Sequence, residues 1–188
     1  MAHLILASSS PRRQELLQQI GLDFTVYSPD IDETVRPDET VQAYVERLAR
    51  AKAQAVLAQF PDAVVIAADT SLSVDGQIIG KPESKQHAFA IWSQLSGRQH
   101  DVLSGVCVAT SQQISSIVVT THVEFQSLSP DDMENYWATG EPLGKAGAYA
   151  IQGIAAQYIP RIEGSYSNVV GLPLYETLQL LKAVKALN

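Results

Sequence analysis

The first residues that could do chemistry are Ser8-Ser9-Ser10-Pro11-Arg12-Arg13, directly after the apolar run from Leu4 to Ala7. We expect a strand, a serine loop and a helix there, with Ser10 as the N-cap and Pro11 at the first helical position. The unpaired N–H groups of a helix start attract an anion, and the hydroxyl and guanidinium groups add donors. The segment favours an anion site, and its alternative is a capped helix with two solvated arginines.

A lysine falls on the apolar face of the next predicted helix, which covers residues 40–59. At about 100° per residue, Lys52 lies between Val45 and Leu48 on that face. Burying an ammonium group without a partner costs several kcal/mol. Lys52 must therefore meet an anion, extend its stem to solvent, or face a cleft.

Asp69 follows Ala63 to Ala68, an apolar run typical of a strand covered on both faces. We expect this strand to end at Asp69 and Thr70, where an open α/β sheet binds its ligands. A carboxylate there suits a metal ion or an attacking water, and the alternative is a structural cap. Lys81, in Gly80-Lys81-Pro82, adds a cation after a hairpin predicted at Asp75-Gly76.

An acidic cluster of Asp30, Asp32 and Glu33 precedes the long helix and indicates either a solvated loop or a metal or water site. The histidines lack HExxH spacing, and the single cysteine, Cys107, cannot form a zinc cluster. Neither G-x-S-x-G nor G-x-G-x-x-G occurs, which disfavours nucleophilic-serine hydrolysis and dinucleotide binding.

Strands and helices alternate around these residues and predict a mixed α/β sheet with flanking helices. Further helices are expected at 84–95, 129–140 and from 173 onward, with long strands at 101–110 and 114–125. The glycine-rich stretch 141–171 has no sustained period. A stretch of that length in a small domain predicts a functional loop.

The chain has 188 residues, 46% of them hydrophobic and 18% charged, which predicts one globular domain over 1–188 and excludes disorder. A net charge of -7 argues against nucleic acid as a partner. No apolar run approaches the ~20 residues of a membrane span, and Met1-Ala2-His3 does not begin a leader. We expect Cys107 to be inert core and the protein to be cytoplasmic.

Seven segments, in order along nearly the whole chain, resemble the motifs of the Maf family of nucleoside triphosphate pyrophosphatases. They are Ser8 to Arg13, Arg47-Leu48-Ala49 with Lys52-Ala53, Ala68-Asp69-Thr70, Gly80-Lys81-Pro82, Leu95-Ser96-Gly97, Lys145-Ala146-Gly147-Ala148-Tyr149 with Ile151-Gln152-Gly153, and Gly164-Ser165-Tyr166 with Asn168 to Pro173. The resemblance implies a mixed twisted sheet with flanking helices and two lobes around a central cleft. It also implies a cytoplasmic enzyme that cleaves nucleoside triphosphates to the monophosphate and pyrophosphate with a divalent cation, Mg²⁺ or Mn²⁺.

The resemblance also assigns roles by position. Asp69 resembles the catalytic carboxylate, which either deprotonates the attacking water or holds the metal ion, and Glu33 resembles a second residue of the metal and water site. The residues that resemble phosphate ligands are Ser8, Arg13, Lys52 and Lys81. They would neutralise the negative charge of a triphosphate.

Three further positions separate branches of the family, and the residues here, Arg12, Thr70 and Gln152, resemble the branch that acts on dTTP and UTP. Gln152 fits a pyrimidine because a side-chain amide offers both a donor and an acceptor. One departure is Gly144, where many relatives have an aspartate. Modified pyrimidine nucleotides as substrates, a homodimer and a link to cell division arrest remain open, and the alternative function is a non-catalytic nucleotide-binding regulator of septum formation.

Overall fold

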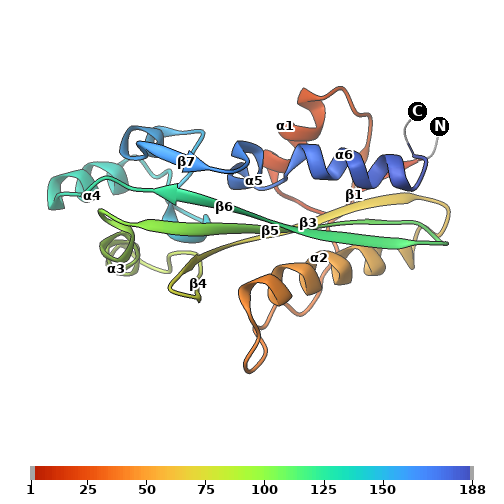
Figure 1. Ribbon diagram of the computed structural model, residues 1–188, viewed down its shortest axis with the longest axis horizontal. Helices are drawn as coiled ribbons and strands as arrows, with labels where there is room; N and C mark the ends of the chain where they lie inside the picture. Colours follow the sequence, from red (N-terminus) through yellow and green to blue (C-terminus); the bar gives the residue numbers. More distant parts are fainter. Residues whose placement is uncertain (1–2, 187–188) are drawn as a thin grey trace.

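One mixed sheet organises the chain, which a computed structural model describes over residues 3–186 (Figure 1). Its seven strands have the order β2-β1-β3-β5-β6-β7, and β4 pairs with β3 beside this path. The strands are β1 (Leu4–Leu6), β2 (Thr25–Val26), β3 (Val64–Val74), β4 (Gln77–Ile79), β5 (Gln99–Ala109), β6 (Ile114–Glu124) and β7 (Arg161–Glu163). Residues 1–2 and 187–188, at the two ends of the predicted domain 1–188, lie outside the described residues.

Four of the six described α-helices begin at a residue whose side chain caps them. The six are α1 (Pro11–Gln19), α2 (Val41–Leu57), α3 (Lys85–Leu95), α4 (Pro130–Ala138), α5 (Tyr166–Val170) and α6 (Leu174–Ala183), with 3₁₀ turns η1 (Ala146–Ala148) and η2 (Ile154–Tyr158). Thr40, Ser84 and Ser129 each accept a hydrogen bond from a backbone N–H of the first turn. The predicted N-cap position of Ser10 and first helical position of Pro11 in α1 are confirmed, although the Ser10 side chain makes no capping hydrogen bond. Its own N–H donates to Ser8 Oγ at 3.2 Å.

Two lobes share the long strands β3, β5 and β6, which have 11 residues each (Figure 1). In one lobe α2 covers one face of the sheet while α1 and α6 cover the other, and the second lobe contains α3, α4, β4 and β7. Small side chains, among them Ala49, Ala53 and Ala67, pack α2 against the sheet. Cys107 lies in this core fully buried, which confirms it as a core residue, and burial raises its pKa to about 11. The α/β fold class is confirmed.

Strand β3 does not end at Asp69, as the sequence predicted. Its antiparallel pairing with β5 runs without a break from Val65↔Ala109 to Ser73↔Asp101, so backbone hydrogen bonding carries the strand beyond its apolar part. On the opposite side, parallel pairing with β1 stops at Leu6↔Ile66, and pairing with β4 begins at Leu72↔Ile79. Among the described strands, residues 67–71 therefore have no partner on this side. Asp69 and Thr70 lie on this open edge.

The glycine-rich stretch 141–171 is not a loop throughout. It includes η1, η2, β7 and α5, each of five residues or fewer, which is too short to give a periodic sequence signal. Strand β7 completes the sheet by pairing with β6, as in His122↔Glu163. The segment is thus held against the sheet while it contributes residues to the space between the lobes.

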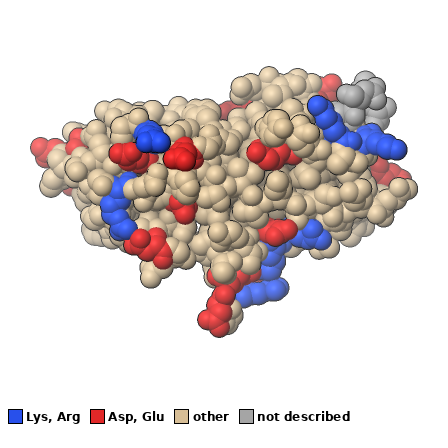
Figure 2. All heavy atoms as spheres, in the orientation of Figure 1, with Lys and Arg blue, Asp and Glu red and all other residues tan. Residues whose placement is uncertain are grey.

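Charged side chains of both signs are interspersed on the face shown in Figure 2, and the described residues form no continuous basic surface there. No helix within residues 3–186 is both long and apolar enough to cross a membrane.

Candidate active site

A cavity of about 800 Å³ lies along the open edge of β3, in the size range of small-molecule sites. It is lined by all the residues that the sequence predicted for the site, namely Ser8, Arg12, Arg13, Glu33, Lys52, Asp69, Thr70, Lys81 and Gln152. They come from the β1–α1 loop, α1, the loop before α2, α2, β3, the loop after β4 and the glycine-rich segment. Residues far apart in sequence therefore converge on one cavity.

Lys52 joins two carboxylates on the α2 face of the sheet. Its Nζ lies 2.8 Å from Asp69 Oδ1 and 2.8 Å from Glu33 Oε1. Asp69 is 9% exposed, whereas the Glu33 side chain is 52% exposed. Burial tends to raise the pKa of Glu33, but hydrogen bonding and attraction from Lys52 lower it overall. Of the three alternatives for Lys52, two hold together: the ammonium group contacts anionic side chains, and it faces a cavity.

A glycine lets α2 approach the sheet beside Asp69. Gly105 is the cross-strand partner of Asp69 in β5, so a side chain there would point to the same face. A Cβ at Gly105 would stand 2.4 Å from the carbonyl oxygen of Val45 in α2. Only glycine permits this contact, and the close packing brings Lys52 within reach of Asp69.

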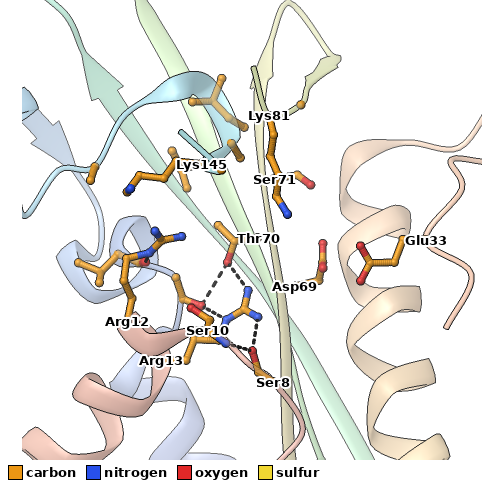
Figure 3. Close-up of a pocket in the computed structure, with 18 of the residues that line it drawn as sticks. Ser8, Ser10, Arg12, Arg13, Glu33, Asp69, Thr70, Ser71, Lys81 and Lys145 are labelled. Carbon is orange, nitrogen blue, oxygen red and sulfur yellow. Dashed lines mark hydrogen bonds between the residues drawn. The ribbon is translucent and has the colours of Figure 1, made fainter. Parts of the chain in front are cut away.

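Arg13 reaches the same cavity from the opposite face of the sheet (Figure 3). Its guanidinium donates to Gly171 O at 2.8 Å, Ser8 Oγ at 3.0 Å and Thr70 Oγ1 at 3.2 Å. Burial lowers its pKa, an effect that nearby Asp69 partly opposes. All its hydrogen-bond acceptors within residues 3–186 are neutral. A guanidinium held in this way is oriented to receive an anion.

The Thr70 hydroxyl belongs to the support of Arg13. Besides accepting from Arg13, Thr70 Oγ1 lies 2.7 Å from Ser104 Oγ and donates to Gly171 O at 3.2 Å. Ser104 is fully buried and contacts the carbonyl oxygen of Asn168 in α5. The predicted contact of Thr70 with substrate stays a prediction.

The loop that carries Glu33 is fastened to α2. Tyr44 Oη donates to Glu33 O at 3.0 Å, and Arg47 Nη2 donates to Thr34 O at 3.0 Å. Arg47 also makes a two-point contact with Glu39, and its hydrogen bond lowers the pKa of Glu39 to about 2. Of the acidic cluster only Glu33 lines the cavity, because Asp30 and Asp32 are exposed outside it.

Lys81 and Lys145 enter the cavity from the second lobe. Gly147 N donates to Gly80 O at 3.1 Å, which ties the two lysine-bearing segments together. The side chain of Lys81 has no hydrogen bond or ion pair within residues 3–186. Sequence reasoning did not single out Lys145, although a cation between two glycines in a functional segment was a usable signal. Tyr44 and Ser71 are further lining residues that it missed.

The carboxylates of the cavity meet the needs of a magnesium ion only in part. Within residues 3–186 no three His, Cys, Asp or Glu side chains come together as a metal cluster. Glu33 and Asp69 do converge on one cation, the Lys52 ammonium. Mg²⁺ is commonly held by one or two carboxylates together with substrate phosphates and water. The donor set therefore fits an ion that binds along with a phosphorylated substrate.

Relatives of this chain carry a consistent name. A protein named dTTP/UTP pyrophosphatase from Acinetobacter baylyi is 75% identical over 183 residues, which cover 97% of this chain and 100% of that protein. A protein of the same name from Colwellia psychrerythraea is 50% identical over 183 residues, covering 95% and 86% of the two chains.

The Ham1 protein of Staphylococcus aureus is similar in fold, with a TM-score of 0.54 at 15% identity over 98% of both chains. The model of one family, described as Maf-like protein, matches residues 3–184 of the sequence. The resemblance drawn from the seven segments is confirmed, and the chain belongs to the Maf-like protein family.

Proposed function

We propose that this protein is a nucleoside triphosphate pyrophosphatase that hydrolyses dTTP and UTP to the monophosphate and pyrophosphate. The observation that carries the proposal is the Glu33–Lys52–Asp69 arrangement in a cavity whose other cations, among them Arg13 and Lys81, have no carboxylate partner within residues 3–186. A triphosphate carries about four negative charges, which such cations can neutralise. The names of the relatives support dTTP and UTP as substrates.

Asp69 is the residue that we assign to activation of water. Lys52 occupies its Oδ1, and within residues 3–186 its Oδ2 has no hydrogen-bond partner. That oxygen can accept a proton from a water molecule in the cavity. Lys52 fixes the orientation of the carboxylate through its contact with Oδ1. The attacked α phosphorus would then lie beside Asp69, within the field of Arg13 and Lys81.

Glu33 and Asp69 are the residues that would hold a divalent cation, Mg²⁺ or Mn²⁺. When bound, such an ion supplies Lewis-acid stabilisation of charge on the phosphate oxygens. Because Lys52 contacts both carboxylates, its ammonium must share them with the ion or move aside. Arg13 and Lys81 contribute positive charge that does not depend on the ion.

Product analysis tests the proposal. Purified protein is incubated with Mg²⁺ and separately with dTTP, UTP, CTP, GTP or ATP, and ³¹P NMR identifies the products. We expect monophosphate and pyrophosphate from dTTP and UTP. Release of orthophosphate and a diphosphate would contradict the cleavage position. Binding of dTTP without turnover would favour the non-catalytic regulator instead.

We further propose a cytoplasmic location, where these substrates occur.

A further inference from the structure

Two cations line the cavity on the side away from Glu33. Figure 3 shows the side chains of Arg12 and Lys145 pointing toward the same part of the cavity, from α1 and from the glycine-rich segment. Neither forms an ion pair with a carboxylate within residues 3–186. Burial lowers the pKa of Lys145, and the charge of Arg12 lowers it further. Two like charges kept this close indicate a ligand that accepts hydrogen bonds from both.

Backbone carbonyl groups hold both cations in place. Arg12 Nε donates to Val170 O at 3.2 Å, which leaves the two terminal nitrogens of its guanidinium toward the cavity. Lys145 Nζ donates to Glu141 O at 2.6 Å. An ammonium has three donors, so Lys145 retains capacity for a ligand. Both groups are thus oriented before any ligand arrives.

Glu141 connects Lys145 to Gln152. Its carbonyl binds the Lys145 ammonium, and its carboxylate accepts from Ile154 N at 2.8 Å and Ala155 N at 3.2 Å, just after Gln152. Tyr136 Oη donates to the same carboxylate at 2.6 Å. Burial acts to raise the pKa of Glu141, but these hydrogen bonds lower it overall, so the group stays ionised at neutral pH.

The residue after Gln152 must be small for this contact. A Cβ at Gly153 would stand 2.1 Å from Glu141 Oε2. Gln152 itself is exposed to the cavity, and its amide has no hydrogen bond within residues 3–186. One residue, Glu141, therefore contacts the cation through its backbone carbonyl and the segment after the free amide through its carboxylate.

We propose that Lys145 is a further specificity-determining residue, which with Arg12 donates hydrogen bonds to the carbonyl oxygens of a pyrimidine-2,4-dione base, while Glu141 positions it relative to Gln152. This inference rests on the proposed function. Thymine and uracil present two carbonyl acceptors on either side of an N–H donor, which two cations and the acceptor oxygen of an amide complement. Cytosine places an amino group where one carbonyl stands, so a donor would meet the donors of a cation.

The test compares bases on one phosphate chain. We expect Lys145→Met to lower the ratio of kcat/KM for UTP to that for CTP by about 10- to 100-fold, because a charge-assisted hydrogen bond to one base is lost. Lys145→Arg, which keeps donors and charge, should retain most of the ratio. Lys182→Met removes an exposed lysine of α6 and is the matched control, with an unchanged ratio.

Equal losses for UTP and CTP in Lys145→Met would overturn the inference, and so would weaker binding of inorganic tripolyphosphate, since either result places Lys145 on the phosphates. Calorimetric binding of UMP and CMP needs no turnover. A wild-type preference for UMP that disappears in Lys145→Met supports the inference even if no nucleotide is hydrolysed, and an unchanged preference contradicts it. Failure of this inference is thereby distinguished from failure of the proposed function.

Glu141→Gln tests the positioning role. The variant keeps the shape of the side chain but replaces one carboxylate oxygen with an NH₂ group. That group cannot accept the hydrogen bonds that Tyr136 Oη, Ile154 N and Ala155 N donate to the carboxylate. We expect the UTP-to-CTP ratio to fall through KM for UTP rather than through kcat. A fall in stability with the ratio intact would make Glu141 merely structural.

Discussion

Cations have different partners on two sides of the cavity. The α2 side contains Lys52, and the glycine-rich side contains Arg12 and Lys145. At the α2 side, Lys52 is balanced by Glu33 and Asp69, each at 2.8 Å. At the other side, Arg12 and Lys145 rest only on backbone carbonyl oxygens within the described part of the chain. A cation bound to two carboxylates holds them in a fixed orientation for chemistry, whereas cations without a carboxylate partner can donate to acceptors on the substrate. We infer that catalysis depends on the α2 side, and that recognition of the base depends on the glycine-rich side, which we call the recognition side.

The largest effect is expected from Asp69→Asn. Removal of the only carboxylate that we assign to activation of water should lower kcat by about 10²-fold or more. The fold should persist, because an amide can still accept from Lys52. Steady-state kinetics at saturating UTP measures the change. Turnover close to that of the wild type would remove Asp69 from the mechanism and erase the difference between the two sides.

Lys52→Met should lower kcat/KM by at least tenfold, which corresponds to about 1.4 kcal/mol of transition-state stabilisation. It also removes the ammonium that contacts both Glu33 and Asp69, so we expect a loss of about 1–3 kcal/mol in the free energy of unfolding at neutral pH. Urea denaturation measures that loss, and unchanged kinetics with lower stability would make Lys52 structural only.

The pH dependence sharpens this prediction. The folded state lowers the pKa of Glu33 from its ordinary value of 4.5, so the stabilisation is present above that value and disappears as pH falls through the folded pKa. The stability difference between wild type and Lys52→Met should therefore shrink below about pH 4.5. A difference that grows on acidification would contradict the ion-pair account.

Gln152→Glu should change the recognition side alone. A carboxylate keeps the acceptor oxygen but has no donor, and its charge would pair with Arg12 and Lys145 in place of the base carbonyl oxygens, so dTTP and UTP should lose about 1–3 kcal/mol of transition-state stabilisation in kcat/KM. Purine nucleotides should lose much less. Measured kcat/KM values for dTTP, UTP, CTP and GTP decide the matter, since an equal fall for all four would show that Gln152 only supports its loop.

The smallest kinetic effect is expected from Gly105→Ala. The added methyl group would push α2 away from the sheet, at a cost of about 1–3 kcal/mol in stability, and would displace Lys52 from Asp69. We expect a lower melting temperature and a several-fold loss in kcat. The UTP-to-CTP ratio should stay that of the wild type, because Gly105 lies away from the recognition side. A changed ratio would show that the two sides are coupled.

Local signals in the sequence predicted the helix starts and the face on which Lys52 lies. Helices were expected to begin near residues 40, 84 and 129, where Thr40, Ser84 and Ser129 cap them, and the turn predicted at Asp75-Gly76 closes the β3–β4 hairpin. These features depend on residues close together in the chain, where spacing alone carries the information.

Features that depend on distant pairing were not predictable in this way. The apolar run stops before Asp69, but pairing with β5 continues strand β3 past Asp69. The strand register places Gly105 opposite Asp69, and no local sequence signal marks that pair. Lys145 and Glu141 lie in a stretch without periodicity, so the approach of Lys145 to the cavity and the contacts of Glu141 require the folded arrangement of η1 and η2. The candidate residues followed from their types and motifs, whereas their division into two sides followed from the structure.

Binding of nucleotides to the Asp69→Asn variant tests the separation of the two sides most directly. Isothermal titration with UTP and CTP in the presence of Mg²⁺ measures recognition while turnover is suppressed. The account predicts that the variant still binds UTP more tightly than CTP, by the same ratio as wild-type protein titrated with UMP and CMP. Loss of that preference together with loss of turnover would contradict it, because recognition would then depend on the carboxylate beside Lys52.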